Sequence, residues 1–187
     1  MRIPVCAIIL AGGKSSRFGS DKAMFVWRGL TLSARIAEEC RAVFDEIIIV
    51  RGQRQRPLEI EGVNEVRDIY PNSGPLGGIH AGLSRAISDL AFVVACDMPT
   101  FSASLARRLL EFADGFDVVA PHDGEQLQPL CAVYRKSVLP VCAKMLVNGE
   151  RSVKRLCGQV KTKVVDCKER GEIFSNVNYT SDLSEHF

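Results

Sequence analysis

Residues 5–22 of the chain read VCAIILAGGKSSRFGSDK, an apolar run that passes directly into a glycine-rich loop with three cations, Lys14, Arg17 and Lys22. The apolar run predicts a buried strand, and the glycines after it let the backbone turn closely. Successive backbone N–H groups in such a loop form a concave site for anions, and the cations add matching charge. The stretch therefore predicts an α/β fold whose first strand delivers a loop to a nucleoside triphosphate.

The spacing of the glycines excludes the two commonest phosphate-binding loops. A P-loop has a glycine, four further residues and then Gly-Lys-Ser or Gly-Lys-Thr. Counting from Gly12 places Arg17 at the second glycine position. Counting from Gly13 places Phe18 there. The dinucleotide pattern Gly-x-Gly-x-x-Gly also fails, because two glycines are adjacent and the next, Gly19, follows six positions later.

Apolar runs of strand length alternate with helix-like patterns along the rest of the chain. This alternation is typical of a parallel sheet covered by helices. Strands are expected at residues 5–10, 47–50, 66–69, 91–96, 118–120, 130–134 and 164–165. Helices are expected at residues 32–44, 79–87, 102–113 and 138–147, with Ser102 as an N-cap and Asn148-Gly149 as a C-cap. We therefore expect an α/β fold with a mostly parallel central sheet flanked by helices, as a single domain over residues 1–187.

Composition places the chain among ordinary globular proteins. Of its 187 residues, 47% are hydrophobic and 25% charged, and the net charge is +2. The small net charge gives no reason to expect nucleic acid or a membrane as a partner, and no apolar run reaches the roughly 18 residues of a membrane span. The seven cysteines form no Cys-x-x-Cys pair, which argues against a disulfide framework or zinc site and predicts a cytoplasmic protein.

Charge is nevertheless uneven along the chain. Residues 144–170 carry eight lysines and arginines against three acidic residues, a local balance of +5. Such a block either receives an anionic second substrate or forms a solvated helix face, and the sequence leaves both open. A second basic stretch, residues 51–56, holds Arg51, Arg54 and Arg56, which either contact phosphate or are simply solvated.

The opening loop resembles the signature loop of the molybdenum cofactor guanylyltransferases. The shared pattern is Leu-Ala-Gly-Gly-x-Ser-x-Arg-x-Gly-x-Asp-Lys at residues 10–22. Its first half is common to several nucleotidyltransferase families of one Rossmann-like fold, and the ending Asp21-Lys22 narrows the choice. Arg17 and Lys22 would be catalytic, since their charge would stabilise the α-phosphate in the transition state and the departing pyrophosphate. The resemblance implies that the nucleotide-binding residues of this loop are Leu10, Ala11, Gly12, Gly13 and Lys22.

Two aspartates follow apolar runs and precede turns, at the sheet edge where open α/β proteins bind ligands. Asp68 is followed by Gly-Pro-Leu-Gly-Gly at residues 74–78, and a similar aspartate and segment in the same family hold the nucleotide. Asp97 ends the run 91–96, and a hard carboxylate there suits Mg²⁺. The resemblance implies that Asp97 is the metal-binding aspartate, and it would thereby be a catalytic and nucleotide-binding residue as well. The plainer alternatives are a turn or N-cap carboxylate for Asp68 and a helix-capping carboxylate for Asp97.

Three late segments, residues 126–134, 149–154 and 174–178, resemble the same family in the same order. Asn176 and Asn178 would point to one side of an extended segment, toward a pterin edge or a phosphate. The alternatives are an Asx turn for the two asparagines and a plain strand start for Gln128. The residues that we expect to bind the acceptor are Gln128, Arg151, Asn176 and Asn178.

The resemblance implies a molybdenum cofactor guanylyltransferase that uses Mg²⁺. The terminal phosphate of molybdopterin would attack the α-phosphate of GTP and release pyrophosphate, with the N-terminal part binding the nucleotide and the C-terminal part binding the acceptor. GTP and molybdopterin would be the substrates, and molybdoenzyme apoproteins or cofactor-handling proteins are candidate protein partners. Two alternatives stay open: a related cytidylyl- or sugar-phosphate nucleotidyltransferase, and a non-catalytic adaptor that carries finished cofactor.

Overall fold

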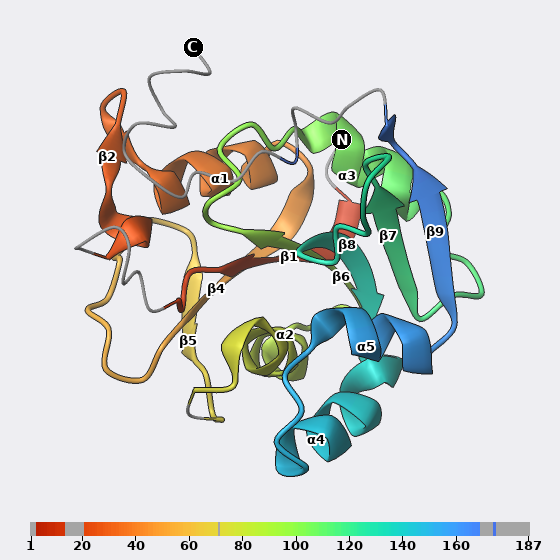
Figure 1. Ribbon diagram of the computed structural model, residues 1–187. Helices are drawn as coiled ribbons and strands as arrows, with labels where there is room; N and C mark the ends of the chain where they lie inside the picture. The colour runs from red at the N-terminus through yellow and green to blue at the C-terminus, as the bar shows by residue number, and fades with distance from the viewer. Residues whose placement is uncertain (1–2, 14–20, 71, 169–173, 175–187) are drawn as a thin grey trace.

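A computed structural model describes residues 3–13, 21–70, 72–168 and 174 of the 187-residue chain. Within these residues, seven strands form a sheet in the order β5-β4-β1-β6-β8-β7-β9 (Figure 1). The strands are β1 (Ile3–Leu10), β4 (Phe44–Arg51), β5 (Asn64–Arg67), β6 (Leu90–Ala95), β7 (Val118–His122), β8 (Cys131–Arg135) and β9 (Thr162–Asp166). Each strand expected from the sequence overlaps one of these.

All strands of this sheet except β8 run in one direction. β1 pairs in parallel with β4 and β6, β4 pairs with β5, and β7 pairs with β9. β8 is antiparallel to both of its neighbours, β6 and β7. The expected α/β fold with a mostly parallel central sheet is therefore confirmed. Because these strands share one direction, β1, β4, β5 and β6 end at the same sheet edge.

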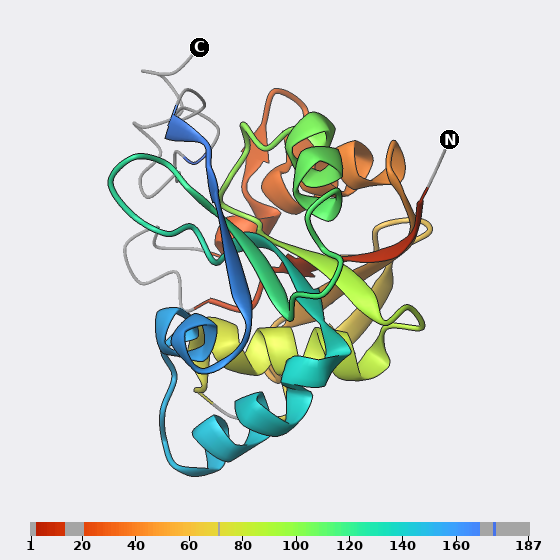
Figure 2. The same ribbon diagram turned by 90° about the vertical axis from the view of Figure 1, so that its right-hand side faces the viewer.

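Helices cover both faces of the sheet, which gives the molecule three layers (Figures 1 and 2). Side chains alternate along β1: Ala7 and Ile9 pack in the core on one face, whereas Cys6 and Ile8 pack in the core on the other. The first face carries α1 (Leu32–Arg41) and α3 (Ala103–Leu110), and the second carries α2 (Gly74–Arg85), α4 (Leu139–Val147) and α5 (Val153–Gln159).

Among the described residues, no helix is both long and apolar enough to cross a membrane.

Two element boundaries expected from the sequence are wrong. Phe44 was expected to end the first helix, but that helix ends at Arg41 and Phe44 begins β4. There its ring stacks on Phe92 of β6, with ring centroids 5.7 Å apart, so tertiary packing overrides the helical spacing. Ile69 was expected in a strand, but β5 ends at Arg67 and Ile69 is exposed.

Other helix boundaries also differ from expectation, and α3 ends at Leu110 rather than at residue 113. α2 begins at Gly74 rather than at residue 79, because Pro75 is well suited to the first turn of a helix. α3 follows Ser102 as expected, although the Ser102 side chain makes no capping hydrogen bond. α5 was not expected at all, and it begins after Ser152, whose hydroxyl accepts a hydrogen bond from the Arg155 backbone N–H.

Two short elements follow the glycine-rich loop and were also missed. The 3₁₀ helix η1 (Lys22–Met24) comes first, and Phe25 connects it to a hairpin of β2 (Val26–Trp27) and β3 (Leu30–Thr31). The hairpin turns at Arg28-Gly29, where both residues have positive φ, a conformation typical of a two-residue hairpin turn. These elements place Lys22 beside the edge of the main sheet.

Candidate functional site

A cavity of about 260 Å³ lies at the sheet edge where β1, β4 and β6 end. Gly12 follows β1, Asp68 follows β5 and Asp97 follows β6, so the parallel strands bring together residues that are far apart in the sequence. All the residues expected to bind the nucleotide line this cavity: Leu10, Ala11, Gly12, Gly13, Lys22, Asp68 and Asp97.

The start of the glycine-rich loop packs tightly against the end of β4. The Ala11 N–H donates to the carbonyl of Val50 over 2.9 Å. A Cβ added at Gly12 would lie 3.1 Å from the backbone nitrogen of Gly52, which is closer than side chains normally approach. At Gly13, by contrast, a Cβ would meet none of the described atoms within 4 Å. Gly12 therefore allows the close approach of two chain segments, while the described residues leave the space beside Gly13 unfilled.

Lys22 and Asp97 form an ion pair across the cavity. The Lys22 Nζ lies 3.1 Å from the Asp97 Oδ2, and the two side chains are 15% and 27% exposed. Asp97 is held in place because the N–H of the preceding Cys96 donates to the carbonyl of Leu10 over 3.0 Å. The Asp97 Oδ2 therefore pairs with a lysine and does not cap a helix.

Cys96 also lines the cavity, but its thiol is not a nucleophile at neutral pH. Burial, with a further contribution from the neighbouring Asp97 carboxylate, raises the pKa of Cys96 to about 12. A thiol with so high a pKa carries almost no thiolate at pH 7. The chemistry of the site therefore rests on its charged groups.

Asp68 has both of its carboxylate oxygens engaged in the turn that leads into α2. Oδ1 accepts a hydrogen bond from the Tyr70 N–H over 2.9 Å, and Oδ2 accepts one from the Ser73 hydroxyl over 2.9 Å. A Cβ at Gly77 would lie 1.7 Å from the Ser73 Oγ and 2.8 Å from the Asp68 Oδ2. Asp68 is thus both a turn carboxylate and a residue of the cavity wall, and Gly77 leaves room for its side chain.

The start of α2 forms another wall of the cavity, through Gly74, Pro75 and Gly78. The unpaired N–H groups and the dipole of a helix N-terminus favour an anion at such a position. His80 lies further along the helix, where its ring packs edge-on against Tyr70. Burial lowers the pKa of His80, so its imidazole is neutral at pH 7 and adds no charge to this wall.

Sequence reasoning assigned no specific contact to Arg51, which also lines the cavity. It was expected either to contact phosphate or to be solvated, but its side chain is fully buried and pairs with Asp21. The signal in the sequence is its position directly after the apolar run Ile47–Val50, which places it at the sheet edge. Arg54 and Arg56 of the same stretch are exposed.

Of the expected acceptor residues, the two that the structure describes, Gln128 and Arg151, do not line this cavity. Gln128 lies in the loop between β7 and β8, where its side-chain amide donates to Asp123 and its backbone N–H donates to the carbonyl of Pro121 over 2.8 Å. The same loop ends at Leu130, which does line the cavity. Arg151 is exposed just before α5. Arg17, Asn176 and Asn178 lie outside the described residues.

The residues present fit a magnesium ion that is held jointly with a substrate. Mg²⁺ is commonly bound by one or two carboxylates together with phosphate oxygens and water. Asp97 offers one partly exposed carboxylate at the cavity wall. Across the described ranges, no group of three or more histidine, cysteine, aspartate or glutamate side chains could hold a metal by itself. The donor set therefore suits a metal that arrives with phosphate oxygens rather than a permanently enclosed one.

Comparison with known proteins agrees with the geometry of the site. Residues 7–164 match the family model described as MobA-like NTP transferase domain. A probable molybdenum cofactor guanylyltransferase of Pelotomaculum thermopropionicum is 37% identical, over 94% of this chain and 88% of its own length. A molybdenum cofactor guanylyltransferase of Desulfosudis oleivorans is 33% identical, over 97% of this chain and 93% of its own. The resemblance found in the sequence is thus confirmed.

Solved structures share the fold across nearly the whole chain. Molybdopterin-guanine dinucleotide biosynthesis protein A from Archaeoglobus fulgidus superposes with a TM-score of 0.83 at 20% identity, covering 97% of this chain and 96% of that one. A 2-C-methyl-D-erythritol 4-phosphate cytidylyltransferase from Thermus thermophilus gives a TM-score of 0.76 at 16% identity, with coverages of 98% and 97%. The fold is therefore the Rossmann-like fold of nucleotidyltransferases, and it is common to enzymes with different nucleotides.

Proposed function

The chain belongs to the MobA-like NTP transferase family and is a nucleotidyltransferase; on this premise we propose that it transfers GMP from GTP to the terminal phosphate of molybdopterin. The observation that carries the proposal is the meeting of the glycine-rich loop with the Lys22–Asp97 ion pair in one cavity. The product would be the guanine dinucleotide form of the cofactor, together with pyrophosphate.

The nucleotide would bind in the N-terminal part of the chain. Gly12, Gly13 and the first turn of α2 all line the cavity, and we propose that their free N–H groups bind phosphate oxygens, since the Ala11 N–H is already bonded to the Val50 carbonyl. Asp68 would orient the nucleotide indirectly, because its carboxylate fixes the turn from which α2 starts.

The transfer would be an in-line displacement at the α-phosphorus. An oxygen of the molybdopterin phosphate forms the new bond to phosphorus, and the bond to the oxygen that bridges the α- and β-phosphates breaks. Pyrophosphate leaves with that electron pair, and Lys22 and Arg17 would stabilise the charge that develops on it. The attacking phosphate is already ionised at neutral pH, so no general base is required.

Nucleotidyltransferases of this kind generally use Mg²⁺, and we propose that Asp97 holds the ion. When bound, Mg²⁺ would neutralise charge on the phosphate oxygens of the nucleotide. Asp97 has a second task in the protein itself, because its Oδ2 holds the Lys22 ammonium at 3.1 Å. The carboxylate thus keeps the lysine at the cavity wall.

The acceptor would bind in the C-terminal part, through Gln128, Arg151, Asn176 and Asn178. The loop that carries Gln128 reaches the nucleotide cavity at Leu130, which gives a route between the two substrates. Its Gln126 side chain accepts a hydrogen bond from Lys154 over 2.8 Å, so a basic helix stands beside this loop. Molybdoenzyme apoproteins or cofactor-handling proteins would receive the product, in the cytoplasm that seven free, buried cysteines favour.

A nucleotide screen tests this proposal directly. Purified protein would be incubated with Mg²⁺, molybdopterin and, in separate reactions, GTP, CTP, ATP or UTP, and pyrophosphate release would be measured. We expect release only when GTP and molybdopterin are both present. Release with CTP in place of GTP would establish the cytidylyl alternative instead. Tight binding of the finished dinucleotide without any pyrophosphate release would establish the carrier alternative.

A further inference from the structure

Arg51, the last residue of β4, places a charged group inside the protein directly beneath the glycine-rich loop. Among the residues that the structure describes, it is the only lysine or arginine that is buried, with 0% of its surface exposed. Its Nη1 donates to the Ala11 carbonyl over 2.8 Å and to the Asp21 Oδ1 over 3.2 Å. Its Nη2 donates to the Asp21 Oδ2 over 2.5 Å and to the Arg56 carbonyl over 2.8 Å.

These contacts join the two ends of the loop. Ala11 lies where the chain leaves β1, and Asp21 lies just before η1, so one guanidinium fixes the separation between them. A guanidinium is planar and offers donors in a rigid fork, which suits a carboxylate and two carbonyls at fixed positions. A lysine ammonium has no such fork, and a methionine of similar length has no donors.

The contact with Asp21 extends to Lys22. The Asp21 Oδ1 also accepts a hydrogen bond from the Ala23 N–H over 3.2 Å and so begins η1. Lys22 is the first residue of that short helix, and its Nζ reaches the Asp97 Oδ2 at 3.1 Å. The Arg51–Asp21 contact is therefore linked to the ion pair in the cavity through the backbone of η1, which Asp21 begins and Lys22 belongs to.

Burial of this arginine is costly for a purely structural purpose. Its Nε has no hydrogen-bond partner within the described part of the chain, and a buried ion pair is often no more stabilising than apolar residues of similar volume. Stability alone therefore gives a weak reason for an arginine at this position. Fixed geometry gives a stronger one, because catalytic groups lose effectiveness when they shift by about 1 Å.

We propose that Arg51 is a positioning residue for nucleotidyl transfer, which acts through Asp21 to hold Lys22 at the α-phosphate. This inference rests on the proposed function for the reaction that it serves. It concerns the geometry of Lys22, however, and that geometry can be measured without any acceptor.

The test uses Arg51→Lys and Arg51→Met in the full chain, and Asp21→Asn, which weakens the same contact from the side of its carboxylate partner. We expect each variant to lower kcat by about 100-fold while the KM for GTP changes much less. Lys22 loses its support through Asp21, whereas the start of the loop is still held by the hydrogen bond from the Ala11 N–H to the Val50 carbonyl. Arg51→Lys combined with Asp21→Glu lengthens the carboxylate arm as the cationic arm shortens, and should recover a large part of kcat. A merely structural arginine would lower thermal stability without this split and without this rescue.

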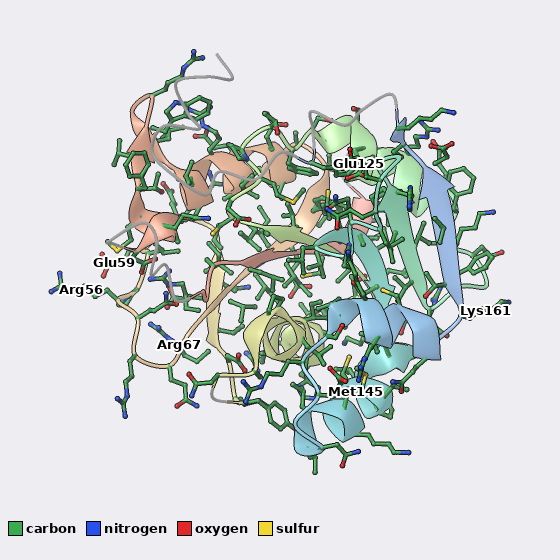
Figure 3. All side chains as sticks on the ribbon, viewed as in Figure 1. Arg56, Glu59, Arg67, Glu125, Met145 and Lys161 are labelled. Carbon is green, nitrogen blue, oxygen red and sulfur yellow. The ribbon has the colours of Figure 1, made fainter. Side chains whose placement is uncertain are left out.

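Arg67→Met is the matched control. Arg67 also donates to backbone carbonyls of the segment after β4, those of Gly52 over 2.9 Å and Gln55 over 2.6 Å, and it has no contact with Asp21 among those described. Figure 3 shows Arg67 and Arg56 on the same side of the molecule, beside β4 and β5. We expect Arg67→Met to keep kcat within about twofold of the wild type.

A second measurement separates this inference from the proposed function. The rate at which an amine-reactive acetylating reagent modifies Lys22 is followed by mass spectrometry, with the exposed Lys168 as internal reference. We expect Arg51→Met and Asp21→Asn to raise the Lys22 rate several-fold and to leave the Lys168 rate unchanged. Wild-type values of kcat and of the Lys22 rate in both variants would overturn the inference. A wild-type protein that binds Mg²⁺ and GTP but transfers nothing to molybdopterin would overturn the proposed function alone, and the labelling result would still decide the role of Arg51.

Discussion

The proposed nucleotide region and the proposed acceptor region of this molecule differ in how far their charged side chains are exposed to solvent. Around the nucleotide cavity, the Arg51–Asp21 pair is 0% and 24% exposed and the Lys22–Asp97 pair is 15% and 27% exposed. Around the proposed acceptor side, Arg155 is 72% exposed in its pair with Glu150, which is itself 26% exposed, and Lys168 and Asp166 are 67% and 68% exposed. Both cations of the first region are largely buried, whereas both cations of the second are exposed to solvent.

This difference indicates a division of labour within one sheet. Charges that are partly desolvated interact more strongly and keep their geometry before a substrate arrives. Exposed charges are screened by water and salt, and they can rearrange around an acceptor. We therefore expect substitutions in the nucleotide region to act on turnover, and substitutions in the acceptor region to act weakly and on the binding of the second substrate.

The largest expected effect comes from the ion pair in the cavity. Lys22→Met and Asp97→Asn should each lower kcat by about 10²–10³-fold. The first removes the cation aimed at the reacting phosphates, and the second removes the carboxylate that holds Lys22 and that we propose holds Mg²⁺. Pyrophosphate release measures the loss, and thermal unfolding checks that the fold persists. Lys168→Met breaks the exposed pair with Asp166, whose atoms are 3.9 Å apart, and should change kcat by about twofold or less. Equal losses in both pairs would remove the contrast between the regions.

Replacing one helical glycine in each region by alanine tests how tightly the two regions are packed. Gly77→Ala should lower the free energy of unfolding by about 1–3 kcal/mol and weaken GTP binding, because the new Cβ would lie 1.7 Å from the Ser73 Oγ. Gly158→Ala in α5 has no described atom within 4 Å of the new Cβ and should raise the free energy of unfolding by about 0.4–1 kcal/mol. Urea titration measures both changes. A stable Gly77→Ala variant with normal GTP affinity would contradict the tight turn beside α2.

The exposure of charged groups differs between the two regions, but the burial of their cysteines does not. The pH dependence of the free energy of unfolding should therefore be similar for a cysteine in each region. Burial raises the pKa of Cys96, beside the cavity, and of Cys142, in α4, from 9.0 to about 12. The stability that these neutral thiols contribute is complete below pH 9 and is lost as the pH rises toward 12, by about 1.4 kcal/mol per pH unit for each thiol. Cys96→Ala and Cys142→Ala should each reduce, by equal amounts, the slope of the free energy of unfolding against pH. Urea titrations between pH 8 and pH 11 measure it, a range that spans about one unit below and two above the free-thiol pKa. A slope that falls in only one variant would show that the cores differ as well.

The smallest expected effect is at Arg151. Arg151→Ala should raise the KM for molybdopterin by about two- to fivefold and leave the KM for GTP unchanged, since an exposed charge contributes little to binding. Arg108→Ala provides a control, because Arg108 is exposed on α3 on the other face of the sheet. Steady-state kinetics with each substrate varied in turn would measure the difference. A large fall in kcat for Arg151→Ala would place this residue with the fixed charges instead.

Much of this arrangement could be predicted because local patterns carry it. The apolar run before Gly12 and the run before Asp97 give strands whose ends must meet once the sheet is parallel. The shared sheet edge and the family resemblance together predict that Lys22, Asp68 and Asp97 lie close to one another, and all three line the cavity.

The parts that escaped prediction depend on contacts between distant segments. Arg51 looks like one of several surface cations until β4 is placed beside the loop that leaves β1. Phe44 fits the helical spacing of the preceding residues, and only its stacking on Phe92 explains the start of a strand there. α5 is short, and the sign of its beginning is the single N-cap Ser152. The roles proposed for Arg17, Asn176 and Asn178 stay predictions.

The reversed strand β8 has a consequence for how the protein is made. β6 pairs with β1 on one side and with β8 on the other, but β8 ends about 40 residues later in the chain. At a synthesis rate of about 5–20 residues per second, the open side of β6 waits about 2–8 s on the ribosome for its neighbour. During that interval the nascent sheet presents an apolar edge of unpaired backbone groups, which other chains can join. Chaperone demand should therefore be concentrated in this brief stage of synthesis rather than in the finished enzyme.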